Sequence, residues 1–392
     1  MSRRLETVKL TAGFKVAERL DLEPLFSTYK EILNELLDYT CKTGITSFKR
    51  LKSEKYNDMR SRYSSLPSHY IYTACQMACS IYKSFRKLRR RGLAKADKPI
   101  FKGNVVMLDD HLFSVDLESW RSSIATDSGR IGVSLCHGTY HEKFKVMRVG
   151  QAWLVKRGCN YYLKVVFSRV VEVAEPNGKA IAVDINEDNV TFGSKEKMVK
   201  RETGERAIRT AYFLKRRRLQ SKLRLNEKPL MAKYRGRERR RVEAVYHELA
   251  KEVIEEAKRQ GCSTIILENL KNIRRRKRSK ELNGRLNRWG FRRLQAIIEY
   301  KAELAGLTVK PVSAKGTSSL CPKCRVKLSP SGHRMMRCPR CGLEEDRDKI
   351  AVINLLQKAD RCALFNRSGR KPPHDTKGEE PAVTEVNAGS ER

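Results

Sequence analysis

Three acidic residues lie in or beside apolar segments that are expected to be buried. Asp184 interrupts an apolar, strand-like run, Glu268 ends a second such run, and Asp348 opens a helix-like segment. A carboxylate among apolar side chains is costly unless it is paired or binds a metal ion. Each acid also has a simpler interpretation: Asp184 as a turn residue at a strand end, Glu268 as a helix-capping acid, and Asp348 as an acid that favours a helix N-terminus.

Taken together, the three acids indicate phosphodiester chemistry. An RNase H-like sheet brings one acid from its first strand, one from a later strand end and one from a helix into a single cluster. Three carboxylates can hold two divalent ions, one activating water and the other stabilising the leaving oxygen of the cleaved phosphodiester. Magnesium is the expected ion, since it accepts carboxylate oxygens and keeps several waters. We therefore expect Asp184, Glu268 and Asp348 to be catalytic and to bind two Mg²⁺ ions.

Four cysteines form a second cluster at metal-ligand spacing. Cys321 and Cys324 make one Cys-x-x-Cys pair, Cys338 and Cys341 make another, and 13 residues separate the two. Thiolates at this spacing can close a tetrahedral shell around zinc. A redox-active pair is the alternative, but it does not explain two pairs. We expect one structural Zn²⁺ ion in a zinc ribbon.

A basic segment closely follows Glu268. Residues 271–293 contain eleven Lys or Arg and one Glu. Such a segment can be a solvated loop or a localisation signal, but its place beside an expected catalytic acid favours a phosphate-gripping element. A related basic run decorates the preceding helical region. The residues expected to contact nucleic acid are Arg216, Arg217, Arg274, Arg275, Arg276, Lys277 and Arg278.

The net charge of the whole chain limits its partners. Lys plus Arg is 83 and Asp plus Glu is 45, which gives a formal net charge of +38. Such an excess repels itself in a compact chain unless a polyanion neutralises it. Nucleic acid is the usual polyanion, because each neutralised phosphate releases condensed counterions. No apolar run approaches a membrane span, and the first residues lack the apolar stretch of a signal peptide, so we expect a cytoplasmic protein without a membrane partner.

The hydrophobic periodicity changes twice along the chain. A lead-in strand near 1–12 precedes a helical region near 20–91, in which Ser68 is a plausible N-cap, and short strand-like runs fill 98–173. After a turn at 175–178, strands alternate with helices, which implies an α/β layer architecture. The expected strands are 179–186, 189–193, 263–267 and 307–312, and the expected helical regions are 207–260 and 285–305. We therefore expect an α/β plus α+β multidomain protein.

The order of these motifs resembles the TnpB family of insertion-sequence-encoded, RNA-guided DNA nucleases, which are similar to the compact type V CRISPR effectors. The resemblance rests on AVDIN, ILENL, E-Y-K-A at 299–302, and the series CPKC, CPRCG, DRD and NL, with a weaker match at 98–102. It implies a β-barrel-like wedge domain (1–16 and 96–178), a helical recognition lobe inserted in it (17–95), an RNase H-like RuvC nuclease domain (179–313 and 343–362) and a zinc ribbon inserted in that domain (314–342). The composition of 363–392 indicates a disordered tail.

The resemblance carries the family's catalytic acids to Asp184, Glu268 and Asp348. Ile350 stands where the family usually has Asn, and Asp346 is a rival for the third acid. The implied partners are a guide RNA from the element's own end and double-stranded target DNA, cut beside a short flanking motif, by a chain expected to be a monomer. Two alternatives remain: an RNA-guided repressor that has lost cutting, and a transposase.

Overall fold

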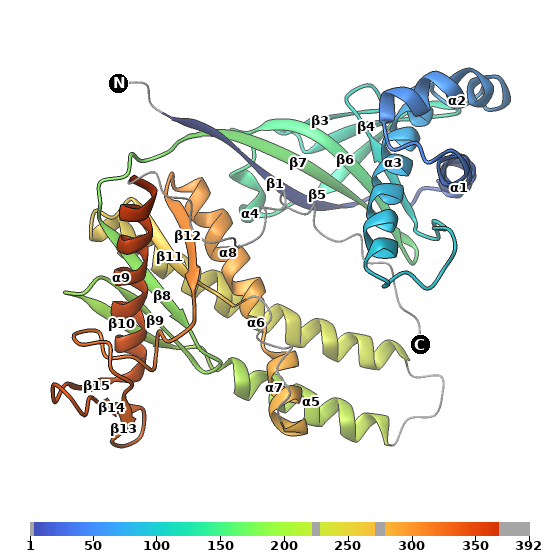
Figure 1. Cartoon of the computed structure of the whole chain (residues 1–392). Coiled ribbons are helices and arrows are strands. Elements are labelled where there is room, and N and C mark those ends of the chain that lie inside the picture. Colours follow the sequence, from blue (N-terminus) through green and yellow to red (C-terminus); the bar gives the residue numbers. More distant parts are fainter. Residues whose placement is uncertain (1–3, 222–227, 271–278, 368–392) are drawn as a thin grey trace. The chain divides into compact units, whose positions relative to one another are not determined.

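The protein is described from a computed structural model, in which residues 4–221, 228–270 and 279–367 are placed. The chain divides into two compact units, one made of 9–169 and the other of 4–8 with 170–367. No helix among the placed residues is long and apolar enough to cross a membrane. Both units mix helices with sheets, as the sequence predicts (Figure 1).

The unit 9–169 combines a seven-stranded sheet with a helical block. Its sheet runs in the order β2-β6-β7-β1-β5-β4-β3, so the lead-in strand joins the later strands and the helices lie between them in sequence. The first residues of β1 and the last of β7 fall in the other unit. Its elements are β1 (Leu5–Val16), α1 (Glu23–Thr43), α2 (Phe48–Arg62), α3 (His69–Arg90), β2 (Val105–Leu108), β3 (Phe113–Asp116), β4 (Arg121–Thr126), β5 (Gly129–Cys136), α4 (Thr139–Glu142), β6 (Arg148–Arg157) and β7 (Asn160–Glu172).

One hydrophobic core joins the helices of this unit to its sheet. Tyr29 and Leu36 on α1 and Ile71 on α3 belong to the same buried cluster as Val106 and Phe167 on the strands. The apolar faces that the sequence shows at three- and four-residue steps therefore pack on the barrel-like sheet. The helix that follows Ser68 does begin at His69, but the Ser68 side chain makes no capping hydrogen bond.

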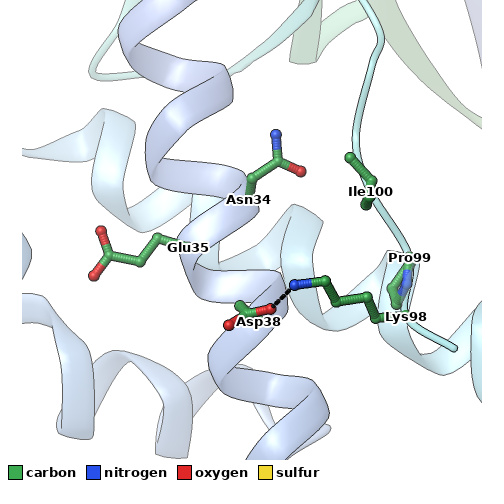
Figure 2. A pocket seen from close by; sticks show the side chains of 6 residues that line it. All are labelled: Asn34, Glu35, Asp38, Lys98, Pro99 and Ile100. Atoms are coloured by element: carbon green, nitrogen blue, oxygen red, sulfur yellow. Dashed lines mark hydrogen bonds and ion pairs between the residues drawn. The ribbon is translucent and has the colours of Figure 1, made fainter.

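A small cavity of about 420 Å³ lies where the segment after α3 crosses α1 (Figure 2). Asn34 holds this segment: its side-chain amide donates to the Phe101 carbonyl at 3.0 Å and accepts from the Phe101 amide at 2.7 Å. Lys98 forms an ion pair with Asp38. The cavity is therefore the space left where this loop docks on α1. All the residues that line it belong to the unit 9–169, whereas Asp184, Glu268 and Asp348 belong to the other unit.

The second unit is built on a five-stranded sheet in the order β10-β9-β8-β11-β12. β11 runs parallel to both β8 and β12, whereas β9 and β10 are antiparallel to their neighbours. Its elements are β8 (Ala180–Ile185), β9 (Asn189–Gly193), β10 (Met198–Glu202), α5 (Glu205–Gln220), α6 (Lys228–Arg259), β11 (Thr264–Asn269), α7 (Lys280–Arg288), α8 (Phe291–Leu304), β12 (Thr308–Ser313), β13 (Ser329–Pro330), β14 (Met335–Arg337), β15 (Glu344–Asp346) and α9 (Arg347–Arg367).

The two faces of this sheet are covered by different helices. On β8, Ile181 and Val183 pack with α6 and α8, whereas Ala182 packs with α9. On β11, Ile265 and Leu267 face α6 and α8, and Ile266 faces α9. A strand buried on both faces has a continuous apolar run, which explains why these two segments show no alternation. Figure 1 shows α9 lying along β8 and β11.

Two expected boundaries differ from the structure. The helical region expected at 285–305 is two helices, because Trp289 takes an extended conformation after α7 and α8 begins at Phe291. Gly290 lies between them, where an added Cβ would lie 2.6 Å from the Tyr246 hydroxyl. The helix α9 continues to Arg367, so the expected tail at 363–392 begins inside a helix, and its remainder from 368 lies outside the described residues. The division into wedge, recognition, nuclease and ribbon domains stays a prediction.

Candidate active site and zinc centre

Asp184 and Glu268 lie side by side at one edge of the sheet. The last paired residues of the parallel strands β8 and β11 are Val183 and Leu267, and each acid comes next in its strand. Because side chains alternate between the two faces of a strand, both acids point to the α9 face. There Asp348 lies in the first turn of α9. The three side chains are buried, with residue exposures of 6%, 7% and 2%.

Hydrogen bonds and ion pairs connect these acids. The Asn186 amide donates to Asp184 Oδ2 at 2.7 Å and to Asp348 Oδ1 at 3.2 Å, so one side chain bridges two acids. Arg334, which precedes β14, reaches Asp348 with Nε 3.1 Å from Oδ2. Lys200 on β10 places its ammonium 2.8 Å from the same oxygen. Asp348 is therefore balanced by two cations, whereas Asp184 has no ion pair within the described residues.

The electrostatics favour a bound cation at Asp184. Burial, followed by the negative charges of Glu268 and Asp348, raises the pKa of the Asp184 carboxyl well above its ordinary value. Burial also raises the pKa of Glu268, against a hydrogen bond from Thr317 that lowers it. A divalent ion between these groups would offset both the desolvation and the repulsion.

The oxygen donors around Asp184 fit magnesium. Thr191 on β9 lies opposite Asp184 in the register, and its hydroxyl is buried without a hydrogen-bond partner among the described residues. Three carboxylates and a hydroxyl are the hard oxygen donors that Mg²⁺ accepts. The three carboxylates lie farther apart than the cysteine sulfurs. Among the described residues, the four cysteines are the one group of three or more His, Cys, Asp and Glu residues with all ligand atoms within 4.8 Å of one another.

The four cysteines converge as a zinc centre requires. Cys321 Sγ is 3.5 Å from Cys341 Sγ, and Cys324 Sγ is 3.3 Å from Cys338 Sγ. A tetrahedral site with Zn–S distances of about 2.3 Å has sulfur–sulfur distances of about 3.8 Å, close to these values. The amides of Cys341 and Arg340 donate to Cys338 and lower its pKa to about 6, so this thiol is ready to bind metal as a thiolate at neutral pH. The cysteines thus fit one structural zinc ion.

Known families and proteins resemble different parts of this chain. A family model described as "Cas12f1-like, TNB domain" matches residues 291–355, and one described as "Uncharacterized protein MJ0013 family" matches residues 25–123. The chain is 39% identical over 202 residues to the TnpB-like protein MJ0751 of Methanocaldococcus jannaschii, covering 48% of this chain and 72% of that protein. The chain belongs to the TnpB-like family. It is also 33% identical over 112 residues to the CRISPR-associated endodeoxyribonuclease Cas12f1 of Sulfoacidibacillus thermotolerans, covering 28% of this chain and 25% of that protein.

Solved structures resemble this TnpB-like chain at a distance. The CasPhi-2 (Cas12j) structure bound to crRNA has a TM-score of 0.44 at 10% identity, over 89% of this chain and 97% of that chain. The Cas12f1–sgRNA–target DNA complex has a TM-score of 0.38 at 15% identity, over 90% of this chain and 100% of that chain.

Several of the residues that contact the three acids of this TnpB-like chain were not predicted from its sequence. Asn186 stands two residues after Asp184, so an amide at that spacing could have been noticed. Arg334 is one of many basic residues near the cysteines, and Lys200 and Thr317 carry no sequence signal at all. These side chains reach the acids only because the ribbon and β10 pack beside α9.

Asp346, the rival of Asp348 for the third acid, and Ile350, on the first turns of α9, occupy different environments. Asp346 is partly exposed on β15, accepts from the Asp348 amide at 2.7 Å and pairs with Lys200 at 3.0 Å, so it caps α9. Ile350 is fully buried and packs with Cys321, Leu328 and Cys338, on the ribbon side of α9. Ile350 therefore adds an apolar contact between α9 and the ribbon.

The expected nucleic-acid contacts are placed unevenly. Arg274, Arg275, Arg276, Lys277 and Arg278 lie outside the described residues. Arg216 on α5 forms an ion pair with Glu238 on α6, and Glu238 also pairs with Arg209. The Arg216 guanidinium therefore connects α5 to α6. Arg217, the next residue, is exposed. Its guanidinium is the better placed of the two for a phosphate.

Proposed function

We propose that this chain is an RNA-guided, magnesium-dependent DNA endonuclease of a transposable element. The observation that carries the proposal is the convergence of Asp184, Glu268 and Asp348, three buried acids far apart in sequence, on one face of one sheet edge. Buried like charges are retained where they bind a cation or take part in catalysis. Membership of the TnpB-like family and the similarity to a Cas12f1 endodeoxyribonuclease support the same activity.

The reaction would be hydrolysis of a DNA phosphodiester in a RuvC-like, RNase H-like domain formed by 179–313 and 343–362. Two Mg²⁺ ions supply an activated water and a counter-charge for the leaving oxygen when they are bound. Asp184, Glu268 and Asp348 would ligate them. Asn186 would hold the Asp184 and Asp348 carboxylates in a fixed mutual orientation. The zinc ribbon at 314–342 would serve as structure.

The proposed partners are a guide RNA from the element's own end and double-stranded DNA, bound by a monomer. A net charge of +38 suits a chain that must hold RNA and DNA together. The sheet and helices of 9–169 would act as the wedge and recognition elements. The protein would read only a short motif beside the target, while base pairing reads the sequence.

The test is expression of the chain together with its flanking DNA, so that its native RNA copurifies. The complex is given plasmids that carry the matching target beside randomised flanks, with and without magnesium, and the ends are sequenced. Magnesium-dependent cutting beside one flank motif is expected. Binding without cutting would support an RNA-guided repressor instead, and joined rather than cut ends would support a transposase.

A further inference from the structure

Thr317 connects Glu268 to the beginning of the ribbon segment 314–342, four residues before Cys321. Thr317 is 3% exposed, and its hydroxyl donates to Glu268 Oε1 at 2.8 Å. Within the described residues this is the one hydrogen bond to the Glu268 carboxylate, so Oε2 is left for another partner. The Thr317 hydroxyl also lies 3.0 Å from the Ala314 carbonyl, but an ionised carboxylate is the stronger acceptor.

A continuous series of hydrogen bonds leads from Thr317 to the first zinc knuckle. The Asn354 side chain on α9 is fully buried and donates to the carbonyls of Thr317 and Leu320, both at 2.7 Å. Arg325 donates to Asn354 Oδ1 at 2.8 Å. Arg325 directly follows Cys324 in a left-handed conformation with φ of 63°, and its backbone amide donates to the Cys321 carbonyl at 2.9 Å. The geometry of the knuckle therefore fixes Arg325, and Arg325 fixes Asn354.

Other side chains of α9 hold the same segment. Arg347 donates to the Ser318 hydroxyl at 3.3 Å, Gln357 to the Pro322 carbonyl at 3.0 Å, and Lys358 to the Ser313 carbonyl at 2.9 Å. Together with Asn354 they bind the chain from 313 to 322 along α9. The hydroxyl that meets Glu268 is thus part of a rigid connection between the ribbon and the helix that carries Asp348.

We propose that Thr317 is a positioning residue of the carboxylate site, holding Glu268 Oε1 so that Oε2 faces a divalent cation, and that the zinc-bound ribbon holds Thr317 in place. This inference rests on the proposed role of the three acids as a divalent metal site. Hydrogen-bond partners of metal ligands fix the ligand's orientation before the ion binds, and losing one typically weakens metal affinity about 10- to 100-fold. Zinc would then control the affinity of the catalytic site.

The test measures binding of Mn²⁺, a paramagnetic ion that also prefers carboxylate oxygens, to the full chain freed of nucleic acid at high salt. Free Mn²⁺ is followed by electron paramagnetic resonance. Thr317→Val keeps the volume but removes the donor, and we expect its Mn²⁺ affinity to fall about 10- to 100-fold. Thr317→Ser should restore wild-type affinity. Ser319→Ala, which removes a nearby hydroxyl that has no hydrogen bond within the described residues, should bind Mn²⁺ as wild type does.

Zinc dependence is tested with Cys338→Ser in the same assay. We expect this variant to lose zinc and to bind Mn²⁺ as weakly as Thr317→Val. Wild-type Mn²⁺ affinity in Thr317→Val would overturn the positioning role, and wild-type affinity in a zinc-free Cys338→Ser would overturn the coupling. Asp184→Asn distinguishes failure of the proposed metal site from failure of the Thr317 role. If Asp184→Asn binds Mn²⁺ as wild type does, the three acids are not the metal site. If it loses Mn²⁺ binding, the metal site stands and the Thr317 variants test the positioning role.

The magnesium dependence of DNA cutting gives a second test, because a merely structural role of Thr317 would not change it. If Thr317 acts through metal affinity, the magnesium concentration for half-maximal cutting rises in Thr317→Val while the rate at saturating magnesium stays near wild type. A lower rate at every magnesium concentration, with unchanged half-saturation, would contradict the proposal.

Discussion

The carboxylate of Asp346 accepts a hydrogen bond from the backbone amide of Asp348 at 2.7 Å, so one acid caps the helix in which the other lies. The two residues are separated by one position and both pair with Lys200, but Asp348 is 2% exposed and contacts Asn186 and Arg334, while Asp346 is partly exposed. Their roles can therefore be told apart by substitution.

Asp348→Asn should abolish DNA cutting, because it removes a negative charge from the proposed metal site. Asp346→Ala should retain cutting and lower the free energy of unfolding by about 1 kcal/mol, the usual cost of losing an N-cap. Plasmid cleavage and thermal melting of both purified variants decide the matter. Loss of cutting in Asp346→Ala with an unchanged melting temperature would reverse the assignment.

Magnesium should stabilise the protein more as the pH rises. The pKa of Asp184 is raised by burial and by the charges of Glu268 and Asp348. Between the ordinary pKa of Asp184 and its raised pKa, the folded protein binds more protons at this carboxyl than the unfolded protein does. Without magnesium, the free energy of unfolding therefore falls as the pH rises through this range. Magnesium binds the ionised form and should reverse that loss.

The measurement is the melting temperature with and without magnesium, at constant zinc, from about pH 4 to pH 8. The difference between the two conditions should grow over this range in the wild type and be flat in Asp184→Asn. A pH-independent magnesium effect in the wild type would contradict the site.

Arg216 and Arg217 should respond differently to replacement by Ala. Arg217→Ala should weaken nucleic-acid binding and reduce the dependence of log K on log salt by about one unit, as loss of one phosphate contact does. Arg216→Ala removes a partner of the buried Glu238 and should cost about 2 kcal/mol, below the usual range because Arg209 still pairs with Glu238. Binding titrations at several salt concentrations and denaturant melts of both variants test this. Equal salt dependence in wild type and Arg217→Ala would exclude the phosphate contact.

Ile350→Asn should destabilise the protein, although Asn is the residue that the family resemblance implies at this position. Ile350 is fully buried among Cys321, Leu328 and Cys338. An amide there would lack apolar contacts and cost about 2–4 kcal/mol. Melting should show the loss, with Ile350→Val as a milder control, and the cutting rate should not rise. Faster cutting by the Asn variant would mean that Ile350 impairs catalysis.

The sequence predicted the elements that carry the acids because their apolar runs are long and uninterrupted. The strand around Asp184 and the one before Glu268 lie where expected, as do β9 and the four cysteines. Asp184 and Glu268 stand two residues after Ala182 and Ile266, so each acid lies on the same face of its strand as that residue. The sequence does not say which helix covers that face, because this depends on tertiary packing. Arg334, Lys200 and Thr317 could not be predicted, because nothing local in the sequence says which loop packs beside a given acid.

The wide spacing of the three acids has a consequence for the chain during its synthesis. Asp184, Glu268 and Asp348 meet only after the start of α9 has left the ribosome, and the segment that holds Glu268 precedes α9, with the four cysteines between them. The basic helices α5 and α6 are made much earlier. Under the proposed function, a nascent chain therefore cannot cut DNA before α9 has been made, whatever nucleic acid its earlier segments have already met.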